Sequence, residues 1–424
     1  MEGKDIQRFL EQMKKIQQNL LVFIQEESNE NENFEILNKI FEDSKICDNK
    51  HEINSVLHMI ANIANNHHHV PNFFNKIDKV LNYFKDSIKK YYSNIEIFNI
   101  FRDCKRTLLF LVEEQIINID KSIITTIGTL DDFFYSFSDY AKYFKPEIEK
   151  FKNEKWFPEK FKYPLEGKIQ DDFYEKRKIG ENDSLIYKLI QKDSIIEFIK
   201  CIEKENIQID EKITHSFYDS NIFLYKNRAK NMLYYAAFYG SIQIFNYLRL
   251  KNIKLEPELW EFAIHGQNAE IIHILEENNV VMLNEKCIQE SIKCHHNDIA
   301  NYFLNNSTEN EKFVCEQAIM YYNYEFVKSE LIDQSLFVKL CQYDHYQLVD
   351  FLLKNNDIDV NQKDSDKKTA LYNSVDAGNI DIVKLLLTKE NIDVNIPLII
   401  FWKFFFIVFE NEIYFYYIQC SIFQ

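Results

Sequence analysis

The sequence predicts an all-α protein in which a helical leader precedes a solenoid of paired helices, with at most one short β-hairpin. Three observations support this fold class. Glycine and proline are scarce, at 7 and 6 of 424 residues, which disfavours turn-dense β-sandwiches and barrels. Apolar residues recur at helical intervals along the leader. Beyond Gly180 the pattern repeats, so we predict a leader at 1–182, a repeat array at 183–395 and an apolar tail at 396–424.

An apolar stripe predicts the first helix of the leader. Its members alternate three and four positions apart: Ile6, Phe9, Met13, Ile16, Leu20 and Phe23. The stripe spans under three heptads, which favours packing within the chain, and a short coiled coil that joins two copies is the alternative. Further leader helices are predicted at 53–64, 73–90, 95–117 and 130–144.

Two segments near the C-terminal end show the repeat most clearly. Residues 348–353 and 382–387 begin 34 positions apart, and each leads to the string Ile-Asp-Val-Asn. A small or apolar residue with apolar residues eight and nine positions later marks the register of each unit. These register positions are Ala236, Ala263, Ser291, Ala318, Leu340 and Ser374, at spacings of 27, 28, 27, 22 and 34 residues. An earlier, degenerate unit at 183–202 is predicted to form the N-terminal cap.

The string TALYNS at 369–374, followed by Gly378, resembles the ankyrin repeat, whose TPLHxA signature opens the first of two helices. The segments YYAAFYGSIQIF at 234–245 and HHNDI at 295–299 look like the large trichomonad set of ankyrin-repeat proteins with an uncharacterised helical leader. The resemblance implies an ankyrin-type helix-turn-helix solenoid that binds a protein partner as a scaffold or adaptor, and no enzyme. Units shorter than the ankyrin period are expected to keep two helices without a hairpin, and one hairpin is expected near 361–368.

The resemblance also implies a partner-binding face. In ankyrin-type repeats the residues just before the inter-helix glycine project from the first helix toward the concave side. The register places these residues there: Phe238, Tyr239, His265, Lys293, Tyr321, Gln342, Tyr343 and Asp376. Aromatic residues in such places supply contact area at low entropic cost. Ordinary surface in a chain with 25 tyrosines is the alternative interpretation.

Several function classes are disfavoured. The seven glycines are too far apart for GxGxxG, GxxxxGK or GxSxG, so no nucleotide cofactor and no catalytic residue is predicted. A net charge of −16 argues against a nucleic-acid surface, because phosphate contacts need clustered lysine and arginine.

Two groups of potential metal ligands are predicted to bind no metal. The run 67–69 is three adjacent histidines without a cysteine or carboxylate at zinc spacing, which indicates a solvent-exposed loop. The second group falls on one repeat and is interpreted as repeat surface: Cys287, Cys294, His295 and His296.

The remaining predictions concern compartment and tail. The eight cysteines form no CxxC and the N-terminus lacks the apolar core of a signal peptide, which predicts a reducing, cytoplasmic location. Residues 396–409 are almost wholly apolar, yet as a helix they would span only about 21 Å of a ~30 Å hydrocarbon core. We therefore expect no membrane span there. A cap over the last repeat, a segment outside the fold, and a tail that tethers an ankyrin protein to a membrane are the alternatives.

Overall fold

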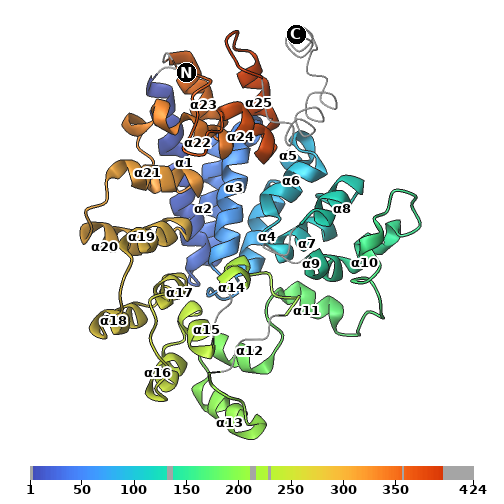
Figure 1. The fold of residues 1–424 in the computed structure, drawn as a ribbon, viewed down its shortest axis with the longest axis vertical. Helices are drawn as coiled ribbons and strands as arrows, with labels where there is room; N and C mark the ends of the chain where they lie inside the picture. Colours follow the sequence, from blue (N-terminus) through green and yellow to red (C-terminus); the bar gives the residue numbers. More distant parts are fainter. Residues whose placement is uncertain (1–2, 131–136, 211–215, 228–230, 356–357, 395–424) are drawn as a thin grey trace. The chain divides into compact units, whose positions relative to one another are not determined.

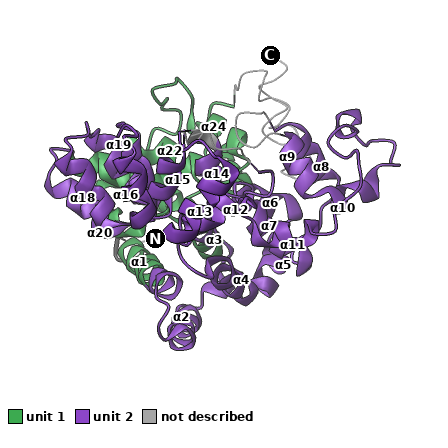
Figure 2. Ribbon diagram, turned by 90° about the horizontal axis from the view of Figure 1, so that it is seen from below, with its two compact units in different colours: residues 1–18, 51–56, 310–424 green, residues 19–50, 57–309 purple. Residues whose placement is uncertain are grey.

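The computed structural model describes residues 3–394 apart from 131–136, 211–215, 228–230 and 356–357. Throughout these ranges the regular structure is helical, from α1 to α25, and the only β-pairing is one bridge between Lys363 and Thr369 (Figure 1). The predicted all-α class is therefore confirmed, and the bridge lies where the one short hairpin was expected. The chain forms two compact units (Figure 2), and each unit combines leader residues with repeat residues.

Unit 1 consists of residues 1–18, 51–56 and 310–424. Its described helices are the N-terminal part of α1 (Gly3–Gln25), the start of α3 (Lys50–Asn66), α21 (Glu311–Met320), α22 (Phe337–Gln342), α23 (Tyr346–Asn355), α24 (Ala370–Ala377) and α25 (Ile380–Leu387). The contacts of α22 with both α23 and α24, and of α24 with α25, define two stacked helix pairs.

Unit 2 consists of residues 19–50 and 57–309. Besides the remainders of α1 and α3, its leader helices are α2 (Glu30–Ser44), α4 (Phe73–Tyr83), α5 (Lys85–Tyr91), α6 (Asn94–Phe101), α7 (Lys105–Glu113), α8 (Lys121–Gly128), α9 (Phe137–Tyr143), α10 (Lys145–Ile148) and α11 (Phe173–Ile179). Its repeat helices are α12 (Leu185–Gln191), α13 (Ile195–Glu205), α14 (Ile222–Asn227), α15 (Met232–Phe238), α16 (Ile242–Leu250), α17 (Leu259–Gly266), α18 (Ala269–Glu277), α19 (Asn284–Lys293) and α20 (Asn297–Asn305).

A turn with a recurring backbone conformation follows the first helix of these repeats. One residue per turn has a left-handed backbone conformation: Gly240, Gln267, His295, Tyr322, Asp344 and Gly378. In four of these six turns, the side chain of the next residue bonds to a carbonyl of the preceding repeat; these residues are Ser241, Asn268, His345 and Asn379. Asn268 donates to Gly240 O at 2.8 Å, and Asn379 donates to Cys341 O at 2.8 Å. These bonds satisfy carbonyls at the ends of first helices, which have no partner within their own helix.

The register predicted from the sequence agrees with the core. All six register positions are fully buried: Ala236, Ala263, Ser291, Ala318, Leu340 and Ser374. One expectation for the short units was wrong. The unit of Ala318, only 22 residues long, has no second α-helix, and 3₁₀ turns at Tyr324–Phe326, Ser329–Leu331 and Gln334–Leu336 take its place. The remaining residues are too few for a second helix with its two links.

The leader agrees with one prediction and differs from another. The stripe of α1 is buried by this chain, as its short length favoured, with Met13, Ile16 and Leu20 fully covered, and it presents no exposed stripe for the alternative, a coiled coil with a second copy. The helices expected at 73–90 and 95–117 are each broken in two, at Phe84 and at residues 102–104. Part of the helix expected at 130–144 lies outside the described residues.

Candidate functional site: the inner face of the repeats

The eight predicted partner contacts fall into three groups by exposure. Phe238, Tyr239 and His265 are buried, and Phe238 and His265 are 1% and 0% exposed. Lys293, Tyr321, Gln342 and Tyr343 are half-buried, and Asp376 is exposed. The side chains of Phe238, Tyr239 and His265 are therefore not exposed to a partner, because other residues of this chain cover them.

A short helix that the sequence left unassigned covers these residues in unit 2. Phe223 on α14 lies with its ring 3.9 Å from the His265 ring and 4.8 Å from the Phe262 ring, and it stacks on Phe238 at 5.8 Å. The ammonium of Lys293 lies 5.2 Å from the centre of the same Phe223 ring. An aromatic side chain from within the chain thus occupies the position that was expected to receive a partner.

The end of α3 covers the next repeat of unit 2. His67 Nε2 lies 2.8 Å from Cys294 O, and Asn66 donates to Lys293 O at 3.3 Å. The His67 and His296 rings are 4.8 Å apart. The solvent-exposed loop predicted for 67–69 was therefore wrong, since His67 and His68 are buried. The repeat surface predicted for Cys287, Cys294, His295 and His296 was also wrong, since all four are buried.

Three buried side chains of unit 2 form a compact group of potential metal ligands. His265, Glu290 and Cys294 bring one ligand atom each to within 4.8 Å of the others, in the part of the chain that the structure describes. His265 Nε2 lies 2.6 Å from Glu290 Oε1, and Cys294 Sγ lies 3.5 Å from His265 Nε2. Burial opposes ionisation of Glu290, but Lys293 and the His265 hydrogen bond outweigh it and lower its pKa to about 2.

A thiol, an imidazole and a carboxylate in this order could also suggest a catalytic nucleophile. Burial raises the pKa of Cys294 well above its ordinary value, and the nearby Glu290 charge adds to that effect. The side chain is also fully covered. Since the thiolate is the reactive form and needs access to a substrate, this arrangement does not provide an activated nucleophile.

In unit 1, the part of α1 up to residue 18 packs against the turn that follows α21. Gln17 is fully buried; it donates to Asn323 Oδ1 at 2.6 Å and accepts from Tyr324 N–H at 2.6 Å. The Phe9 ring meets the Tyr324 ring edge-on at 6.1 Å. The leader thus satisfies buried polar groups of the turn that follows α21.

The start of α3 packs against the next turn of unit 1, which joins α22 to α23. Asn54 donates to Asp344 Oδ2 at 2.8 Å, and the His51 ring stacks on Tyr346 with centroids 3.6 Å apart. In unit 1, as in unit 2, leader residues occupy part of the inner face. The side chains of Tyr321, Gln342, Tyr343 and Asp376 remain partly or fully accessible.

His345 in the same turn gives unit 1 a pH dependence. Its Nε2 donates to Ile319 O at 2.7 Å, its ring stacks on Tyr322 and meets Tyr324, and burial lowers its pKa to about 4. The folded pKa is below the unfolded value of about 6.5, so stability is complete above pH 6.5 and falls as the pH drops toward 4. At pH 4.5 this histidine should lower the free energy of unfolding by roughly 2–3 kcal/mol relative to pH 7. In urea unfolding at pH 7 and 4.5, His345→Gln, which keeps the donor, should show a pH dependence smaller by that amount; an unchanged dependence would contradict the assignment.

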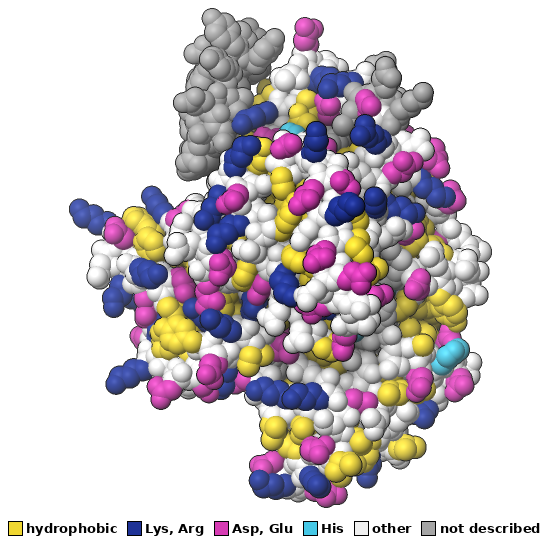
Figure 3. Space-filling model, turned by 180° about the vertical axis from the view of Figure 1, so that it is seen from behind, with side chains coloured by type: hydrophobic (Ala, Val, Ile, Leu, Met, Phe, Trp, Pro, Cys, Tyr) yellow, Lys and Arg dark blue, Asp and Glu magenta, His cyan; other side chains and the backbone are white. Residues whose placement is uncertain are grey.

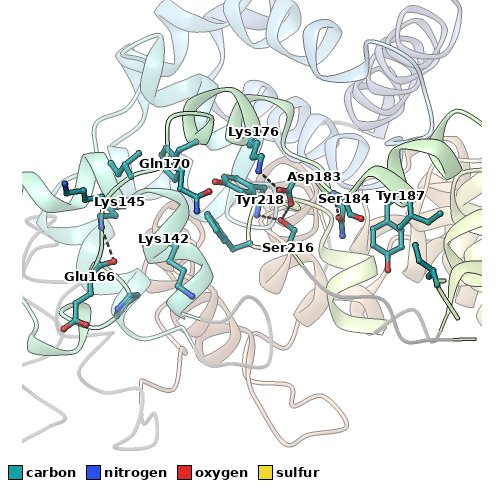
Figure 4. Close-up of a pocket in the computed structure, with 18 of the residues that line it drawn as sticks. Lys142, Lys145, Glu166, Gln170, Lys176, Asp183, Ser184, Tyr187, Ser216 and Tyr218 are labelled. Atoms are coloured by element: carbon teal, nitrogen blue, oxygen red, sulfur yellow. Dashed lines mark hydrogen bonds and ion pairs between the residues drawn. The ribbon is translucent and has the colours of Figure 1, made fainter. Parts of the chain in front are cut away.

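A cleft of about 750 Å³ in unit 2 is a second candidate site (Figure 4). Lys142, Lys145, Lys176 and Tyr218 are among its lining residues. Two of its lysines have partners within the protein: Lys176 pairs with Asp183 at 2.8 Å, a carboxylate to which Ser216 also donates, and Lys145 donates to Gly167 O at 2.6 Å. These polar groups therefore bind protein atoms of the cleft itself.

Charged side chains of both signs lie on the face of the molecule seen in Figure 3. On the face seen in Figure 3, basic and acidic side chains alternate, and no patch of one sign dominates. Alternating signs do not provide the clustered positive charge that phosphates require.

Comparison with known proteins finds ankyrin repeats in the C-terminal part of the chain. Residues 313–397 match the family model described as "Ankyrin repeats (3 copies)". The described part of that segment contains most of α21 and all of α22–α25. The match covers 85 of 424 residues, so the leader and the units before residue 313 lie outside it. No curated protein matches the chain, and the narrower trichomonad resemblance stays a prediction.

A search of the described helices finds none with the length and apolarity that a membrane crossing requires. The apolar tail at 396–424, on which the membrane-tether alternative rests, lies outside the described residues.

Proposed function

We propose that this chain is a protein-interaction scaffold or adaptor that takes a protein partner through the ankyrin repeats at its C-terminal end. One observation carries the proposal: residues 313–397 match ankyrin repeats, a module that suggests protein–protein interaction. The stacked pairs α22–α23 and α24–α25 support it, because stacked repeats form an extended surface suited to a protein ligand. We propose a binding role and not a catalytic one.

We place the partner on the part of the inner face that the leader leaves accessible in unit 1. Tyr321 and Tyr343 are half-buried there, and Asp376 on α24 is exposed. Half-buried tyrosines lose little side-chain entropy on binding and contribute much contact area. The cytoplasmic location and the division at residues 182 and 395 remain predictions alongside this proposal. All seven cysteines among the described residues are free thiols, as a reducing compartment would keep them.

Alanine substitution tests the proposed surface once a partner has been purified. We expect Tyr321→Ala and Tyr343→Ala each to weaken binding by more than ~1 kcal/mol, or about fivefold, in isothermal titration calorimetry. Tyr302→Ala, on the outer helix α20, is the matched control and should bind like the native chain. Melting curves exclude unfolding as the cause. Native affinity in both test variants would show that the partner binds elsewhere.

A further inference from the structure

We propose that His265, Glu290 and Cys294 bind one divalent transition-metal ion of the zinc class, a site distinct from the partner surface. The three side chains come from two neighbouring repeats: His265 stands at the end of α17, whereas Glu290 and Cys294 stand one turn apart at the end of α19. The bound ion would therefore clamp adjacent first helices, which already pack side by side.

The donor set matches the coordination chemistry of zinc. Imidazole nitrogen, thiolate sulfur and carboxylate oxygen are the three ligand types that Zn²⁺ takes in proteins. A tetrahedral ion with Zn–N near 2.0 Å and Zn–S near 2.3 Å separates nitrogen from sulfur by about 3.5 Å. Cys294 Sγ and His265 Nε2 are 3.5 Å apart.

Two adjustments are needed to admit the ion. The His265–Glu290 separation must increase from 2.6 Å to about 3.3 Å, the tetrahedral value. Cys294 Sγ also lies 3.6 Å from His265 Nδ1, so it is nearly equidistant from both ring nitrogens, and the ring must turn to direct Nε2 at the ion. Both movements are side-chain rotations.

The electrostatics of the pocket favour a divalent cation. Glu290 is a buried carboxylate whose charge is balanced by Lys293, with Nζ 2.6 Å from Oε1. Lys293 is partly exposed and can turn toward solvent when an ion replaces it. A divalent ion with one thiolate, one carboxylate and one neutral imidazole has no net charge, which suits a site from which water is excluded. The three side chains leave the fourth position to a small ligand such as one water molecule.

Metal titration of the full chain tests the site. The protein is stripped with a chelator under reducing conditions and then titrated with Zn²⁺ or Co²⁺ alone. We expect the native chain to bind one equivalent more than Cys294→Ser, with a thermal midpoint that rises on zinc addition. With Co²⁺, we expect a cobalt–thiolate charge-transfer band that Cys294→Ser lacks. His265→Gln should lower zinc affinity at least tenfold.

Matched controls separate the site from other thiols and imidazoles. Cys201→Ser, on α13, and His273→Gln, exposed on α18, should titrate like the native chain. Cys294→Ser replaces one sulfur atom with a smaller oxygen atom, and circular dichroism of the metal-free proteins checks that this variant folds. Equal zinc stoichiometry in native and Cys294→Ser chains, or no cobalt–thiolate band in the native chain, would overturn the proposal.

Discussion

Replacing Gly266 with alanine is expected to destabilise the protein by roughly 3 kcal/mol or more, at the upper end of the cost of overpacking. A Cβ at this position would lie 2.1 Å from Ala237 O and 2.7 Å from Gly240 N. Both atoms belong to the backbone of the preceding repeat, so no side-chain rotation can relieve the clash. The two repeats would have to move apart, although their first helices, α15 and α17, share a close-packed contact.

Gly128→Ala is the matched control for that substitution. Gly128 also ends a helix, α8, but its nearest neighbour is Lys160 Cε at 3.2 Å, on a flexible side chain that can shift. We expect this change to alter stability by less than about 1 kcal/mol, since alanine also has the better helix propensity. Urea unfolding at pH 7 measures both. Equal stabilities for the two variants would mean that the repeats do not approach as closely as the structure shows.

Gln17→Leu is expected to cost about 2–5 kcal/mol, because it leaves two buried polar groups without their Gln17 partner. The side-chain oxygen Oδ1 of Asn323 loses its 2.6 Å hydrogen bond from Gln17 Nε2. The backbone N–H of Tyr324 loses its 2.6 Å hydrogen bond to Gln17 Oε1. Leucine cannot replace either bond, and the site is fully enclosed. This decrease in the free energy of unfolding measures how much the contact between α1 and the turn after α21 stabilises unit 1.

The adjacent residue supplies the control. Gln18 is exposed, and its bond to Glu325 at 3.0 Å lies at the surface. Gln18→Leu should change the free energy of unfolding by less than about 0.5 kcal/mol. If Gln17→Leu and Gln18→Leu have the same free energy of unfolding, that result would contradict a buried contact between α1 and the turn after α21.

The repeat array could be predicted because its core recurs along the sequence. Ala236, Ala263 and Ser374 are small where two helices of a repeat close on each other, and apolar residues follow at fixed offsets. The turns were harder to recognise. Only Gly240 and Gly378 are glycines, whereas the other left-handed turn positions hold glutamine, histidine, tyrosine and aspartate. At two of these turns, Asn268 and His345 bond to a carbonyl of the preceding repeat and hold the turn in place without a glycine.

The sequence alone could not predict that α14 and leader residues cover part of the inner face of the repeats. In an ankyrin-type array this face is expected to be open, so Phe238 and His265 were interpreted as partner contacts, and 67–69 as a loop. Whether an aromatic residue in such a place meets solvent or core depends on a distant segment, here Phe223 and the end of α3. A weak signal existed, since Phe238 and Tyr239 are large aromatics and such side chains are mostly buried on average.

Whether the repeats need the leader in order to fold can be tested by removing the leader. In each unit, buried leader side chains such as Gln17 and His67 bond to repeat backbone or turn residues. A chain of residues 183–424, without the leader, is compared with the full chain by thermal unfolding and by binding of a hydrophobic dye. We expect the shortened chain to bind the dye and to lose its cooperative transition. A cooperative transition within a few degrees of that of the full chain, without dye binding, would contradict this expectation.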